Sequence, residues 1–271
     1  MNNKEIVFLS SYNIEDFERP SVASDIVIFT MRSGDEDSYR HNPRNSLSVL
    51  LVKRGEHPYK DCWALPGGFL RGNETVEECA YREITEETGV IPTALMHMGV
   101  FSKPDRDPRG RVISQAFLSV TGDENLNLQS GTDTIDAQWF DISFEKSSKE
   151  GCILRLENDN TVMETVLFEK YSRFGKTEYE VIQNGNLAFD HAQIIASALN
   201  LLRKSAGDFE LIFDFLPEKF TLTQLQKVQE TIMNISVLPA NFRRKIANYV
   251  VETDEYTSGA GHRPAKLFKR K

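Results

Sequence analysis

Apolar residues in the first half of the chain occur in short runs of strand length. Residues 26–29 and 47–52 are such runs, rich in β-branched side chains. Residues 33–45 between them are polar and charged and contain Pro43, which predicts an exposed loop. Residues 111–120 and 137–140 are further strand candidates. Residues 161–168 and 177–182 look like strands separated by a turn at Gly175, and we assign them to the same β-rich domain.

The period changes to that of helices beyond the turn at residues 184–186. Apolar positions between Asp190 and Gly207 have helical spacing, a second helix is expected over 223–232, and a third from about 240 to 251. A Gly-rich turn at 258–261 and a basic strand at 263–271 follow. The pattern predicts two domains, residues 1–185 and residues 186–271, the second beginning with a linking helix.

One segment of the first domain carries both helix signals and candidate chemistry. Residues 68–90 read GFLRGNETVEECAYREITEETGV. Thr75 and Glu78 have the spacing of a capping box, and Gly89 can end the helix in the left-handed conformation. The spacing therefore predicts a helix over residues 76–88.

Three carboxylates lie on one face of this expected helix. Glu83, Glu86 and Glu87 are at positions i, i+3 and i+4, so their negative charges repel one another unless a cation neutralises them. Ligands that are all oxygen favour Mg²⁺ or Mn²⁺ over zinc. The alternative is a solvated acidic face, which is what most acidic clusters are. The fixed register with Gly68, Glu74, Arg82 and Gly89 favours the metal site.

The spacing of these residues resembles the Nudix box at each defining position, from Gly68 through Glu74 to residues 82–90. The resemblance implies an α/β/α sandwich with a mixed sheet. It implies that Arg82 orients the carboxylates, and that Glu83, Glu86, Glu87 and the backbone at Gly68 hold the metal. The expected reaction is attack of metal-activated water on a diphosphate phosphorus. The general base is one of the three glutamates or a residue outside the box.

A cationic loop follows the box at residues 104–112, where three arginines lie beside two prolines and a glycine. Arginine forks suit phosphate oxygens, and an aspartate could hold the arginines or reach ribose hydroxyls. The alternative is an exposed turn with local ion pairs. The stretches ERPSVASDIVIFT, KRGEHPYKDCWALPGGF and SKPDRDPRGRVIS resemble ADP-ribose pyrophosphatases, and more closely the Nudix-related transcriptional regulators of NAD metabolism. The residues expected to bind substrate are Arg54, Arg106, Asp107, Arg109 and Arg111.

The resemblance to these regulators continues through the second half, where the family has a winged helix-turn-helix domain. A basic cluster at the start of the third helix and a basic hairpin suit double-stranded DNA. The residues expected to bind DNA are Arg243, Arg244, Lys245, Arg263 and Lys266. The alternative is a solvated basic tail on a dimerisation module. His191 is interpreted as a packed or capping histidine and is assigned no role.

Charge is divided unevenly between the two halves. The net charge is −8, but residues 201–271 hold 12 Lys and Arg against 8 Asp and Glu, which suggests that the two parts have different partners. Three cysteines without metal-ligand spacing indicate a reducing cytoplasmic compartment. No apolar run is long enough to span a membrane, and the start lacks the pattern of a signal peptide.

Two functions remain open from the sequence. One is a Mg²⁺-dependent hydrolase that cleaves ADP-ribose, or a related nucleoside diphosphate derivative, to AMP and ribose 5-phosphate. The alternative is a transcriptional repressor of NAD metabolism that uses the Nudix domain as an ADP-ribose sensor. The intact box favours hydrolysis and the basic C-terminal part favours DNA binding, so we expect one protein that does both. A homodimer is expected because such domains usually contact paired half-sites.

Overall fold

The computed structural model describes residues 2–32, 45–90, 92, 94–122, 134–149, 151–171, 177–207, 209–257 and 264–271. Three of the predicted turns lie outside the described residues: the loop at 33–44, the turn at Gly175 and the Gly-rich turn at 258–261. Arg263 also lies outside them.

The first part of the chain forms a mixed sheet with strand order β10-β9-β8-β7-β2-β1-β6-β5. Central strand β1 (Ser21–Arg32) runs parallel to β6 (Val112–Thr121) and antiparallel to β2 (Ser46–Arg54). The strands predicted within residues 1–185 lie in this sheet, whereas β3, β4, β5 and β8 were not predicted. The other strands are β3 (Trp63–Ala64), β4 (Gly67–Phe69), β5 (Met96–Phe101), β7 (Thr134–Lys146), β8 (Gly151–Glu157), β9 (Val162–Tyr171) and β10 (Thr177–Gln183).

Helices cover both faces of the sheet. Alternate residues of β1 point to opposite sides, and on each side they are apolar and pack against a helix. Ile26 and Ile28 pack in one cluster with Ile84 of α2 (Val76–Thr88). Val27 and Phe29 belong to a larger cluster that includes α3 (His191–Ser205) and continues into the C-terminal part. The predicted sandwich of a mixed sheet between helices is confirmed.

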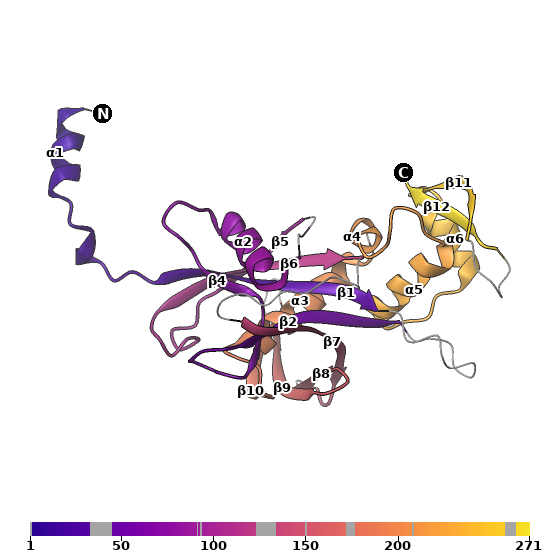
Figure 1. Cartoon of the computed structure of the whole chain (residues 1–271), viewed down its shortest axis with the longest axis horizontal. Coiled ribbons are helices and arrows are strands. Elements are labelled where there is room, and N and C mark those ends of the chain that lie inside the picture. The colour runs from indigo at the N-terminus through magenta and orange to yellow at the C-terminus, as the bar shows by residue number, and fades with distance from the viewer. Residues whose placement is uncertain are drawn as a thin grey trace.

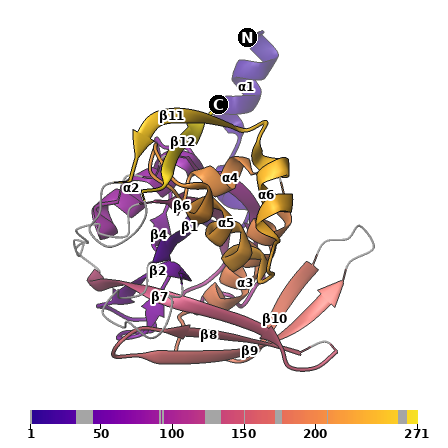
Figure 2. The same ribbon diagram turned by 90° about the vertical axis from the view of Figure 1, so that its right-hand side faces the viewer.

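The C-terminal part lies at the far end of the molecule from the N-terminus (Figure 1). It contains three helices and a two-stranded hairpin, and Figure 2 shows this hairpin beside α4 and α6. The elements are α4 (Glu210–Phe213), α5 (Leu222–Met233), α6 (Pro239–Ile246), β11 (Val250–Tyr256) and β12 (Lys266–Arg270).

The third predicted helix was too long at its C-terminal end. It was expected to reach residue 251, but α6 ends at Ile246 and Val250 begins strand β11. The reason is that β-branched Val250 and Val251 pair with Arg270 and Lys269 of β12, so tertiary pairing overrides the helical period. The basic cluster Arg243–Lys245 consequently lies in the last turn of α6, and not at its start as expected.

A helical segment precedes the sheet. Helix α1 (Asn3–Ser11) and the short η1 (Ile14–Asp16) contain no buried residue and project away from the rest of the molecule (Figure 1). The three cysteines are free. Among the residues that the structure describes, no helix is long and apolar enough to cross a membrane.

Candidate active site and nucleic-acid interface

Helix α2 begins and ends where its sequence predicts. The Thr75 hydroxyl accepts a hydrogen bond from the Glu78 amide at 3.2 Å, and the Glu78 carboxylate accepts one from the Thr75 amide at 2.7 Å. Gly89 ends the helix with φ 70°. Both ends are therefore fixed by local hydrogen bonds and backbone conformation, which holds the glutamates of the helix in a defined register.

Arg82 is the centre of a carboxylate cluster. Its guanidinium donates to both Glu74 oxygens, at 3.0 and 2.8 Å, and to Glu83 at 2.6 Å. Its contact with Glu86 is longer, 3.3 Å. The Arg82 side chain is only 16% exposed, and its hydrogen bond lowers the pKa of Glu74. Arg82 thus contacts carboxylates of the box and a backbone carbonyl, that of Phe69.

Glu87 points to the loop before the helix. Its carboxylate accepts hydrogen bonds from the Gly67 amide at 2.9 Å and from the Thr134 hydroxyl at 3.0 Å. Burial, together with the charge of Glu83, raises the pKa of Glu87 to about 7 despite these bonds. The desolvation of Glu87 therefore outweighs both hydrogen bonds and the positive charge of Arg54.

The two glycines before the helix are required by close approaches. Gly67 has φ 155°, and a β-carbon there would lie 2.3 Å from the Ser24 carbonyl oxygen. A β-carbon at Gly68 would lie 2.2 Å from a Glu83 carboxylate oxygen. The backbone at Gly68 is thus packed directly against a carboxylate of the box.

The three glutamates face different partners in the structure. Glu83 and Glu86 contact Arg82, whereas Glu87 contacts Gly67 and Thr134. Across the described ranges, no three His, Cys, Asp or Glu side chains converge closely enough to form a ready metal site. The donors still suit a hard divalent cation, because all of them are carboxylate oxygens.

Beside the glycines lies a small cavity of about 50 Å³. Four of the five residues expected to bind substrate line it together with Gly67 and Gly68, namely Arg54, Arg106, Asp107 and Arg109. Arg111 does not line it, since its guanidinium donates to the Ser102 carbonyl oxygen at 2.6 Å. The cationic loop and the carboxylate helix thus meet at the glycine loop.

Arg109 covers this cavity. It donates two hydrogen bonds to Asp107, at 3.1 and 2.7 Å, and its guanidinium lies 4.8 Å from the Phe69 ring and 5.6 Å from the Phe189 ring. Burial alone would raise the pKa of Asp107, but the hydrogen bonds from Arg109 outweigh it and lower that pKa. The Arg109 side chain is 44% exposed, so it can turn toward a ligand without losing a buried position.

Arg106 has a different environment. It is almost completely buried and donates to Asp25 at 2.9 Å and to Asp190 at 2.7 and 3.0 Å. Ser114 donates to the same Asp25 oxygen at 2.6 Å. His191 is also buried, and burial lowers its pKa while its Nδ1 accepts from the Leu65 amide at 2.8 Å.

Sequence reasoning missed Asp25, Asp190, Phe69 and Phe189, and it assigned no role to His191. One signal was present, because Asp25 is an acidic residue directly before the apolar run of a buried strand. The pairing of Asp190 with Arg106 had no local signal, since the two residues are 84 positions apart.

The candidate DNA surface lies on α6 and the hairpin. Arg243, Arg244 and Lys245 are exposed, while Phe242 and Ile246 on the other face of α6 are buried. Arg243 and Lys266 line one groove between α5, α6 and the hairpin, with a volume of about 540 Å³. Lys266 also pairs with Glu252 at 2.8 Å, which raises its pKa. The structure therefore brings Arg243 and Lys266 to one groove, while Arg244 and Lys245 are exposed beside Arg243 in the last turn of α6.

Two family models match separate parts of the chain. Residues 38–146 match the NUDIX domain, and residues 212–269 match the NrtR DNA-binding winged helix domain. The chain consists of a Nudix domain followed by a C-terminal winged helix domain of the NrtR type, within a mixed α+β fold.

Individual relatives cover different parts of the chain. A 96-residue stretch is 53% identical to an ADP-ribose pyrophosphatase of Methanocaldococcus jannaschii, covering 35% of this chain and 55% of that enzyme. An ADPR responsive transcriptional repressor, NtrR, of Acinetobacter baylyi is 27% identical over 98% of this chain and 88% of its own. A MutT/nudix family crystal structure from Enterococcus faecalis superposes with a TM-score of 0.74 at 27% identity, covering 100% of this chain and 94% of that one.

Proposed function

We propose that the Nudix domain hydrolyses the diphosphate of ADP-ribose, or of a related nucleoside diphosphate derivative, to AMP and ribose 5-phosphate. The observation that carries the proposal is the junction at Gly67–Gly68, where Glu87 bonds the Gly67 amide and Glu83 lies against Gly68, beside the arginine-lined cavity. An arginine-rich cavity suits a diphosphate, and an acidic helix beside it suits a divalent cation. The 53% identity to an ADP-ribose pyrophosphatase over 96 residues supports the substrate class.

Glu83, Glu86, Glu87 and the Gly68 carbonyl are proposed to hold Mg²⁺ or Mn²⁺. When bound, the cation lowers the pKa of water and neutralises charge on the phosphate oxygens. Arg82 keeps Glu83 and Glu86 oriented, because its fork is fixed by two bonds to Glu74. The general base is one of the three glutamates or a residue outside the helix.

The remaining residues of the cavity are proposed to bind and orient the substrate. Arg54 and Arg109 supply positive charge at its surface, and both lie against the Phe189 ring, at 5.1 and 5.6 Å. Their planar guanidinium groups suit phosphate oxygens, and the aromatic contacts fix their planes. Arg106 and Asp107 hold the loop from within. Arg111 is proposed to act at the rim, where its bond to Ser102 orders the loop.

We propose that the winged helix domain binds double-stranded DNA and represses transcription. The described residues that would contact phosphate or bases are Arg243, Arg244, Lys245 and Lys266, with Arg263 added from the sequence. The similarity over 98% of the chain to an ADPR responsive transcriptional repressor supports this second activity. NAD metabolism is the proposed setting of this repression. In the alternative, the Nudix domain only senses ADP-ribose. The intact set of glutamates favours turnover over sensing alone.

A homodimer in the cytoplasm is proposed as the working form. Paired half-sites on DNA require two winged helices related by a two-fold axis. The apolar residues of α1, Ile6 to Leu9, are all more than half exposed, which is typical of a surface that another chain covers. The free cysteines support a reducing compartment.

The test is the release of AMP from ADP-ribose with Mg²⁺ and with EDTA, using ADP-glucose and NADH as comparison substrates. We expect metal-dependent release that is fastest with ADP-ribose. Tight binding of ADP-ribose without AMP release would favour the sensor. Faster cleavage of NADH than of ADP-ribose would indicate that dinucleotides are the substrate class.

A further inference from the structure

The segment that begins α3 is also part of the cavity. Phe189 lines the cavity in the left-handed conformation with φ 53°, and the next residue but one, His191, accepts a bond from the Leu65 amide. The Ala188 amide donates to the Trp63 carbonyl at 2.8 Å. Residues 188–191 are thus fastened to the strand and loop that lead into Gly67–Gly68.

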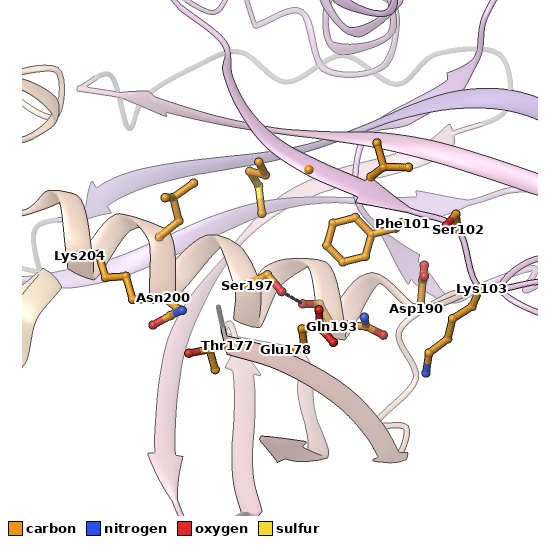
Figure 3. Close-up of a pocket in the computed structure, with 14 residues that line it drawn as sticks. Phe101, Ser102, Lys103, Thr177, Glu178, Asp190, Gln193, Ser197, Asn200 and Lys204 are labelled. Atoms are coloured by element: carbon orange, nitrogen blue, oxygen red, sulfur yellow. Dashed lines mark hydrogen bonds between the residues drawn. The ribbon is translucent and has the colours of Figure 1, made fainter. Parts of the chain in front are cut away.

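Asp190 connects this segment to the cationic loop. Arg106, Asp25 and Asp190 have side chains only 4%, 10% and 12% exposed, so their ion pairs are shielded from water. Arg106 lines the arginine cavity, whereas Asp190 lines a second cavity of about 460 Å³ along α3. Figure 3 shows Asp190 at the start of α3, next to the segment that carries Ser102 and Lys103. The ion pair therefore separates the two cavities.

The other end of α3 contacts the winged helix domain. Arg203 donates to the Ile232 carbonyl at the end of α5 at 3.2 Å. Gln229 of α5 donates to the Ala206 carbonyl at 3.3 Å, and Leu199 and Leu202 share a core cluster with Leu225. One continuous helix of 15 residues therefore runs from the arginine cavity to α5.

We infer that the diphosphate of a bound ligand competes with Asp190 for the guanidinium of Arg106, and that this exchange couples the ligand to DNA binding through α3. The inference rests on the proposed function. Arg106 bonds Asp190 through Nε and Nη2 and bonds Asp25 through Nη2, so a third anion that draws the guanidinium toward the cavity weakens its bonds to Asp190. The Asp190 side chain makes no capping hydrogen bond in its own helix. When its ion pair with Arg106 weakens, the first turn of α3 therefore loses its side-chain contact with the cationic loop.

Thermodynamic linkage makes the coupling between the two ligands measurable as a change in affinity. If ADP-ribose changes DNA affinity by some factor, DNA changes ADP-ribose affinity by the same factor, typically about 5- to 150-fold. Asp190→Asn keeps an acceptor for Arg106 but removes the charge, and Arg106 remains paired with Asp25. The variant therefore resembles the ligand-bound state before ligand is added. If the Asp190–Arg106 ion pair only supported the fold, Asp190→Asn would lower the free energy of unfolding without altering the effect of ADP-ribose on DNA affinity.

The experiment measures fluorescence anisotropy of operator-length DNA with and without saturating ADP-ribose in a Mg²⁺-free buffer. It compares wild type, Asp190→Asn and, as a matched control, Asp159→Asn in the exposed turn after β8. We expect ADP-ribose to change the DNA affinity of the control by the same factor as that of wild type. In Asp190→Asn the ratio of DNA affinities with and without ADP-ribose should lie within about 2-fold of one. The DNA affinity of ligand-free Asp190→Asn should equal that of ligand-saturated wild type.

A wild-type factor retained in folded Asp190→Asn would overturn the inference and leave the proposed function intact. A wild-type factor of one, or no DNA binding by wild type, would overturn the regulatory proposal itself. Amide hydrogen exchange of the wild-type protein tests the same coupling without relying on a variant that must fold. ADP-ribose should change the exchange of amides in residues 187–195 and in α5 by at least about 3-fold, and unchanged exchange there would overturn the coupling.

Discussion

The two helices that carry the candidate chemistry, α2 and α6, differ in how their charges are held. Helix α2 has a capping box at its start and a left-handed glycine at its end. Its carboxylates Glu83 and Glu86 are already bonded to Arg82. Helix α6 has eight residues, no side-chain cap and three exposed cations in its last turn. Preorganised charge suits catalysis, whereas exposed cations suit phosphates along a duplex.

The largest expected effect is loss of turnover on substitution of Glu87. Glu87→Gln removes one negative charge from the metal-binding face while it keeps the shape of the side chain. We expect AMP release at saturating Mg²⁺ to fall by about 10²- to 10³-fold, because metal stabilisation of the transition state is worth several kcal/mol. The matched control is Glu77→Gln on the same helix, whose carboxylate contacts His97 at 2.9 Å. Equal turnover in the two variants would remove Glu87 from the site.

The next effect tests whether the charges of α2 are preorganised by Arg82. Arg82→Met leaves the largely buried Glu74 and Glu83 without their partner. We expect the free energy of unfolding to fall by about 3 kcal/mol, measured by urea denaturation. Arg71→Met is the control, because Arg71 is 64% exposed and its ion pair with Glu86 is worth less than about 1 kcal/mol. Similar losses in both variants would show that Arg82 is no more than a surface residue.

The buried Glu87 carboxylate of α2 should make the free energy of unfolding depend on pH. The pKa of Glu87 is raised from 4.5 to about 7, so its stabilising contribution is fully present below pH 4.5 and is lost as pH rises through 7. Urea denaturation of metal-free protein should therefore show wild type losing stability relative to Glu87→Gln as the pH rises from 4.5 to about 7. Parallel pH profiles for the two proteins would contradict the burial of an ionisable carboxylate there.

The smallest effects are expected on α6. Arg243→Ala, Arg244→Ala and Lys245→Ala should each weaken DNA binding several-fold and lower the salt slope by about 1, because each removes one phosphate contact. Hydrolysis should not change. Lys149→Ala, an exposed lysine of the Nudix domain, is the control for loss of charge alone. If the control lowers the salt slope as much as the α6 variants do, the basic surface is not the DNA contact.

The sequence predicted what is determined locally. Helix α2 was predicted from residue 76 to 88, because capping residues and the terminal glycine are neighbours in the chain. The end of α6 was wrong because pairing of Val250 with β12 is a tertiary effect. The Arg106–Asp190 pair joins residues 84 positions apart, so no periodicity or local motif indicates it. The roles assigned to the individual site residues and the domain boundary near 185 remain predictions.

The most direct test of a protein with one catalytic and one DNA-binding helix assays three proteins for both activities. Wild type, Glu87→Gln and the double variant Arg243→Ala/Arg244→Ala are each measured for AMP release from ADP-ribose and for DNA anisotropy at fixed salt. We predict that Glu87→Gln loses hydrolysis and keeps DNA affinity, while the double variant keeps hydrolysis and loses DNA affinity. Loss of both activities together in either variant, or of neither, would contradict the account.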